Sequence, residues 1–148
     1  MANNYLLFSE MLDLKSKEEF EWVKQEIKGL REEHDKNDNP MLDFEYALEE
    51  SETEPKKYGL WVYTEEAGEP EKVGVLVQRY LNRFCPDEIF TLTWAATCSK
   101  PRIGEFSGGG MVVTAKRIYF SEASDWTAKK VKEIEKRTKR TKRTKRAK

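Results

Sequence analysis

The residues best suited to chemistry or binding lie close together, between Cys98 and Gly110. A cysteine becomes a nucleophile once it is deprotonated, and nearby cations such as Lys100 and Arg102 favour the thiolate form. The same two cations can instead bind a carboxylate or a phosphate. The segment also contains Glu105, Phe106 and three consecutive glycines at positions 108–110. Catalysis and binding are therefore both to be considered.

The sequence offers no clear base or second catalytic group to act with Cys98. A nucleophile needs a base within hydrogen-bond reach, and the only histidine, His34, belongs to the far end of a predicted first helix. The pairs Glu49–Glu50 and Glu65–Glu66 are typical of solvated carboxylates at a strand end and in a turn. Cys85 and Cys98 lack the spacing of metal ligands or of a disulfide framework. We predict no catalytic residue, no metal and no cofactor, and interpret Cys98 as a free, partly buried thiol.

The three glycines precede a strand-like run rather than a helix. Dinucleotide-binding and phosphate-binding loops need a helix N-terminus after the glycines, where backbone N–H groups face the phosphate. We expect a bulge or a close backbone approach instead. Pro101 fixes φ and so stiffens the backbone that presents its two cationic neighbours. The sequence thus predicts a binding edge that acts by contact. Its residues are Lys100, Arg102, Glu105, Phe106, Gly108, Gly109 and Gly110.

Strands and helices alternate along the chain in a recognisable order. Strand patterns cover residues 5–14, 42–49, 58–64, 90–95 and 111–120, with the connection at 98–110 before the last. Ser16 and Glu19 have capping-box spacing at the start of a helix over 17–34. A second helix follows Pro70, and a third begins near Trp126 after Ser124 or Asp125. The second helix has an apolar stripe at helical spacing. This stripe consists of Val73, Leu76, Val77, Tyr80, Leu81 and Phe84.

This order predicts an α+β fold of two layers, a largely antiparallel sheet with helices on one face. The first six elements have the βαββαβ order of a ferredoxin-like unit, followed by an extra strand and a C-terminal helix. The chain has 148 residues, enough for one domain with a core, which we place over residues 1–135. The sequence has no run of eighteen apolar residues and no signal-peptide pattern. We therefore expect a soluble, cytoplasmic protein that does not enter a membrane.

The net charge of zero hides an uneven distribution. All 27 acidic residues but only 18 of the 27 basic ones lie in residues 1–135, so this body carries a net charge of −9. The tail over residues 136–148, KRTKRTKRTKRAK, has nine basic residues and nothing apolar to bury. We predict that it is disordered when free. It either contacts phosphates or acidic surfaces with release of counterions, or is a repeat expansion without a role.

Three stretches of the sequence resemble a family of small uncharacterised proteins from bacteriophages and plasmids. They are LLFSEMLDL, GLWVYTEEAGEPEKVGVLVQRYLNRF and WAATCSKPRIGEFSGGGMVVTA, and the most specific portion runs from Thr97 to Gly110. The resemblance covers about residues 4–127. Ser107 departs from the pattern, which usually has glycine there, and the basic tail is peculiar to this chain. The resemblance implies a mobile genetic element as the setting, and no function or site.

A non-enzymatic binding protein is the function that we expect. An acidic body suits a partner with a basic surface, such as a nucleic-acid-handling or defence protein of the host, which the protein would inhibit. Carboxylates between Glu45 and Glu54 would line one edge. The alternative is a nucleic-acid-binding protein that uses the tail together with Lys100 and Arg102. A cysteine-dependent enzyme is the least favoured class.

Overall fold

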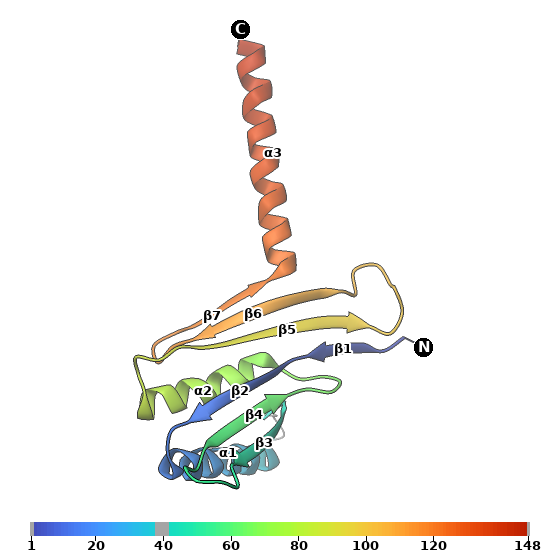
Figure 1. Ribbon diagram of the computed structural model, residues 1–148. Coiled ribbons are helices and arrows are strands. Elements are labelled where there is room, and N and C mark those ends of the chain that lie inside the picture. The colour runs from blue at the N-terminus through green and yellow to red at the C-terminus, as the bar shows by residue number, and fades with distance from the viewer. Residues whose placement is uncertain (1, 38–41, 148) are drawn as a thin grey trace.

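The computed structural model describes residues 2–37 and 42–147, which form two antiparallel sheets and three helices (Figure 1). Sheet A has the strand order β1 (Asn4–Leu7), β5 (Phe90–Cys98), β6 (Ser107–Val113) and β7 (Ile118–Glu122). Sheet B has the order β2 (Ser9–Leu14), β4 (Tyr58–Tyr63) and β3 (Glu45–Glu50). The helices are α1 (Lys17–Asn37), α2 (Pro70–Phe84) and α3 (Ala123–Ala147).

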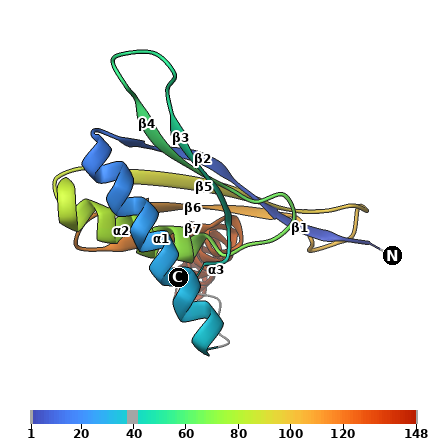
Figure 2. The same cartoon turned by 90° about the horizontal axis from the view of Figure 1, so that it is seen from below.

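Two of the helices cover one side of the strands. Helices α1 and α2 lie together on that side, and α3 stands out from sheet A on the opposite side (Figures 1 and 2). The predicted α+β class, with antiparallel strands and packed helices, is confirmed. The single sheet of a ferredoxin-like unit is not confirmed, because the strands belong to two sheets.

The first predicted strand, residues 5–14, is divided at Phe8 between the two sheets. Thr64 bonds the backbone at this point: its N–H donates to the Phe8 carbonyl at 3.0 Å, and its hydroxyl donates to the Leu6 carbonyl at 2.5 Å. The Phe8 N–H donates to the Thr64 hydroxyl oxygen at 3.2 Å. Before Phe8 the chain pairs with β5, and after it with β4. One continuous segment thus joins the two sheets.

The Ser16 cap of α1 forms as predicted, and the side chain of Glu19 reaches back to Lys15 and into the core. The Glu19 N–H donates to the Ser16 hydroxyl oxygen at 3.2 Å, and the Glu19 carboxylate accepts the Lys15 N–H at 2.6 Å. This carboxylate is buried, and it also accepts a hydrogen bond of 2.9 Å from the hydroxyl of Tyr80 on α2. Burial and this hydrogen bond raise the pKa of Tyr80. The cap therefore also ties α1 to α2.

The apolar stripe of α2 packs into the core, as predicted. Five of its six residues are buried and the sixth, Phe84, is partly buried. They share one hydrophobic cluster with Leu92 of β5 and Met111 and Val113 of β6, each of which is at most 2% exposed. This packing holds α2 against sheet A and fixes which face of the sheet is left for solvent.

Helix α3 continues through the basic tail to Ala147, where the sequence predicted disorder from residue 136. None of its described residues is buried. The hydroxyls of Thr138, Thr141 and Thr144 each donate to the carbonyl four residues earlier. These bonds are local, and neighbouring like charges oppose helix formation in a basic segment that buries none of its described residues. Disorder of the tail in free solution stays a prediction.

Candidate functional site

The predicted binding edge is divided between a hairpin tip and the interior of a strand. Strands β5 and β6 are longer than predicted, so their connection is only residues 99–106. Lys100, Arg102 and Ile103 are exposed at this tip. The Arg102 N–H donates to the Lys100 carbonyl at 2.8 Å, which closes a tight turn around Pro101. The hairpin tip therefore presents the two cations to solvent, as a contact site requires.

The sequence placed the three glycines in a connection over residues 98–110, and this prediction is wrong, because they lie inside β6. Gly108, Gly109 and Gly110 pair with Ala95, Trp94 and Thr93 of β5. Of the two predicted alternatives, a bulge or a close approach, the structure shows a close approach at Gly109, against which the Trp94 indole packs. Gly110 faces the opposite side of the sheet. The glycines thus support the sheet rather than form a flexible loop.

The remaining predicted residues of this edge differ in their surroundings. Glu105 is half-buried and lines a hollow of about 400 Å³ between the hairpin tip and β1. Phe106 is 54% exposed. Two bonds between the ends of β1 and β5 fix the base of the tip: Ser99 N–H to the Asn3 carbonyl at 2.9 Å, and Asn3 N–H to the Ser99 hydroxyl oxygen at 2.8 Å. Within residues 99–106 no ion pair joins Glu105 to either cation.

Cys98 ends β5 opposite Asn4 and is a half-buried free thiol. None of the hydrogen bonds among the described residues engages it. Cys85 is a second free thiol, buried after α2. Among the described side chains, which exclude that of His34, no group of three or more residues has the arrangement of a metal site. None of the helices described here is long and apolar enough to cross a membrane.

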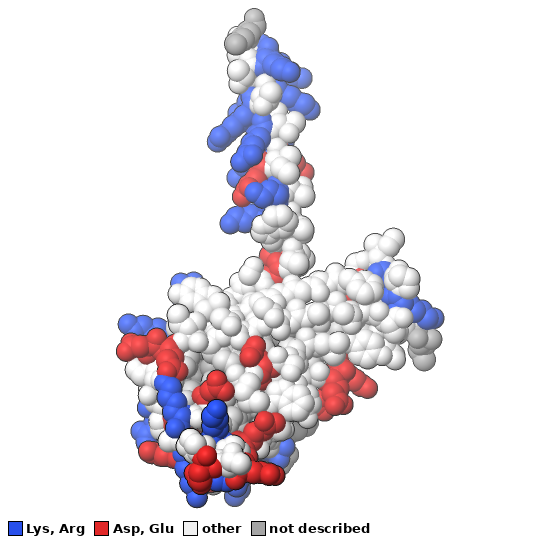
Figure 3. All heavy atoms as spheres, viewed as in Figure 1, with Lys and Arg blue, Asp and Glu red and all other residues white. Residues whose placement is uncertain are grey.

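The solvent side of sheet A is an uncharged surface, which we call the neutral face. It consists of the outward residues Tyr5 and Leu7, alternate residues from Thr91 to Thr97, alternate residues from Gly108 to Val112, and Tyr119 and Ser121. None of these described residues is charged. In Figure 3 the upper part of the domain, around the base of α3, carries few charged side chains, whereas the lower part carries many. A sequence signal exists, since residues 89–99 and 106–115 contain no charge.

The solvent side of sheet B has a different character, which we call the acidic face. Its outward positions carry the carboxylates of Asp13, Glu45 and Glu49 and no basic residue within the three described strands. Between them the rings of Trp61 and Tyr63 stack with centroids 4.0 Å apart. Two of the predicted edge carboxylates are therefore on this face. The aromatic pair was missed, because a strand with apolar residues on both sides does not show which ones face solvent.

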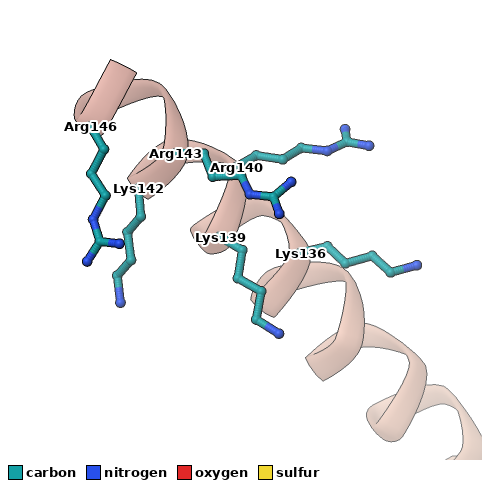
Figure 4. A pocket seen from close by; sticks show the side chains of 6 residues that line it. All are labelled: Lys136, Lys139, Arg140, Lys142, Arg143 and Arg146. Carbon is teal, nitrogen blue, oxygen red and sulfur yellow. The ribbon is translucent and has the colours of Figure 1, made fainter. Parts of the chain in front are cut away.

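The basic end of α3, residues 136–147, is the most strongly charged surface. Six of its side chains line one hollow of the helix surface along successive turns (Figure 4). They are Lys136, Lys139, Arg140, Lys142, Arg143 and Arg146. At about 100° per residue these six positions fall within an arc of about 160°, so the cations share one side of the helix end. Nearer the domain, Lys130 pairs with Glu133 at 2.9 Å and lowers the pKa of that carboxyl.

Comparison with protein-family models found no match to this chain, and comparisons with curated proteins and with solved structures found none either.

Proposed function

We propose that the protein is a non-enzymatic binding protein of a phage or plasmid, and that it contacts nucleic-acid phosphates through the basic end of α3. One observation carries this proposal: the end of a helix dense in cations stands clear of the domain, with residues 136–147 exposed (Figures 3 and 4). The cytoplasm is the proposed place of action, and two free cysteines suit its reducing conditions.

The charge distribution favours contact by α3 alone. Cations that neutralise phosphates release condensed counterions, which drives binding without sequence preference. A single α-helix also fits the width of the DNA major groove. The body over residues 1–135 carries a net charge of −9 and repels phosphates. Contact through the end of α3 therefore leaves the acidic body at a distance from the nucleic acid.

The experiment compares the full chain with a chain that lacks residues 137–148. Binding of a labelled DNA duplex and of an RNA is followed by fluorescence anisotropy over a salt series. We expect steeply salt-dependent binding by the full chain and a large loss on truncation, while the thermal midpoint stays within a few degrees. Unchanged binding by the truncated chain would contradict the proposal. Asp13→Asn with Glu45→Gln is the matched control, since it alters charge far from α3 and should not weaken binding.

The acidic face supports a second candidate function, the binding of a basic host protein. The carboxylates around the Trp61–Tyr63 pair can bind lysine and arginine side chains through their negative charge. The two aromatic rings attract the same cations. An inhibitor of a nucleic-acid-handling or defence protein would use such a surface. Affinity purification from host cells with residues 137–148 removed tests this candidate. A stoichiometric partner that is lost in the Glu45→Gln, Glu49→Gln variant supports it, and retention of the partner by that variant argues against it.

A further inference from the structure

We infer that the neutral face of sheet A, together with an apolar stripe on α3, is covered by a second copy of the chain. This inference is independent of the proposed contact with nucleic acid. Charged residues make up 36% of the chain, yet none of the outward residues on the four strands of sheet A is charged. Solvent-facing sides of antiparallel sheets usually carry polar residues in alternation with the core. Here Leu7, Val112 and Tyr119 are 36%, 37% and 48% exposed.

Helix α3 adds a second uncovered apolar surface on the same side of the sheet. Trp126, Val131 and Ile134 are 62%, 53% and 53% exposed. At 100° per residue they fall within an arc of about 140°, so they form one stripe. The helix follows β7 directly and stands on the side of sheet A that faces away from α2 (Figures 1 and 2). A helix of this kind is stabilised mainly by tertiary packing of its apolar side. One partner can therefore cover both surfaces.

The absence of charge favours a second copy as that partner. In a twofold dimer each patch meets its own copy, so a charged patch would oppose like charges. The acidic body would repel itself over most of its surface, and the neutral face is where two copies approach without this cost. The neutral face also lacks the positive charge that a nucleic acid would need.

The size of the surface explains why α3 belongs to the same interface. Four strands at about 4.8 Å spacing and about 24 Å of strand length give a face of roughly 450 Å² per copy. Two such faces bury about 900 Å², below the 1,200–2,000 Å² or so of a stable interface. The stripes of two α3 helices supply the missing area. The basic end beyond Ile134 is not needed for this contact.

The test is the mass of the full chain by analytical ultracentrifugation over a concentration series. We expect a dimer, and Val112→Lys should raise its dissociation constant by on the order of tenfold or more. Met11→Lys is the matched control, because Met11 is also 37% exposed on a strand but lies on sheet B. Ile134→Lys provides a second variant that cannot disturb the core, since no described residue of α3 is buried. It should weaken the dimer as well.

Several outcomes separate this inference from its competitors. Removal of residues 137–148 should greatly weaken nucleic-acid binding but leave the dimer, so the two proposals fail independently. A chain that is monomeric at every concentration would overturn the inference, as would a dimer that both lysine variants leave intact. Capture of a host protein by a monomeric chain, lost in Val112→Lys, would also overturn it and assign the face to that protein.

Discussion

The indole of Trp94 on β5 lies against the backbone of Gly109 on β6. A Cβ atom placed on Gly109 would stand 2.5 Å from Cζ2 of the indole and 2.8 Å from the Ser121 carbonyl oxygen. Both distances are shorter than any ordinary contact, so the strand can accept only glycine here without a shift. The next glycine, Gly110, has room, because its nearest neighbours would be 3.7 Å away.

Gly109→Ala should therefore destabilise the domain, whereas Gly110→Ala should not. We expect a loss of about 1–3 kcal/mol in the free energy of unfolding for Gly109→Ala, because Trp94 or β7 must move. Gly110→Ala should change it by about 0.5 kcal/mol or less. Urea denaturation of the two variants measures the difference. Equal effects would show that the contact with the indole does not require glycine.

Leu76→Ala should be strongly destabilising, because Leu76 is 1% exposed in the core between α2 and sheet A. A cavity of this kind costs about 2–5 kcal/mol. Val75→Ala on the same helix is the control, since Val75 is 37% exposed and its removal should cost less than about 1 kcal/mol. Chemical denaturation of both variants checks the predicted inward direction of the stripe. A larger loss for Val75→Ala would reverse that assignment.

Stability should fall in alkaline solution in a way that depends on Tyr80. An unfolded tyrosine ionises near pH 10, whereas burial and the bond to Glu19 raise the pKa of folded Tyr80 above its ordinary value. The contribution of protonated Tyr80 to the free energy of unfolding is therefore fully present below about pH 10 and is lost as the pH rises further.

Tyr80→Phe tests this pH dependence. Below pH 10 the variant should be less stable by about 1 kcal/mol, because Glu19 loses a hydrogen bond. Above pH 10, the difference in the free energy of unfolding between the variant and the natural sequence should shrink, since phenylalanine has no proton to lose in the unfolded state. Urea unfolding at a series of pH values measures both. Parallel stability curves for the two proteins would show that Tyr80 does not contribute to the alkaline loss.

Replacement of both Lys100 and Arg102 by alanine should weaken partner binding by on the order of 1–3 kcal/mol if the contacts are charge-assisted. Both side chains are exposed, so fold stability should change little. Cys98→Ser should retain function, because binding needs no thiolate. The two variants are compared in the same nucleic-acid and affinity-purification assays. Loss of function in Cys98→Ser alone would make the thiol the functional group.

The sequence alone determined the elements whose signals are local. The stripe of α2 repeats at helical spacing after Pro70, and the capping pair Ser16 and Glu19 lies within four residues, so both were predicted correctly. The core side of β5 was predictable as well, because Phe90 and Leu92 alternate with polar residues. In each case the stability of the element depends on nearby residues of the chain or on the burial of one side. Both are visible in the spacing of residue types along the sequence.

The tertiary structure decided everything that depends on a partner strand. Leu6, Phe8 and Leu12 keep one two-residue register, interrupted only by Glu10, and nothing in that pattern shows that the chain changes sheets at Phe8. The glycines of β6 acquire their role only when Trp94 pairs with Gly109. Alternation shows which side of a strand is buried, but distant residues determine what lies beside it. For the same reason, the uncharged runs at 89–99 and 106–115 become one open face only when their strands assemble into a sheet.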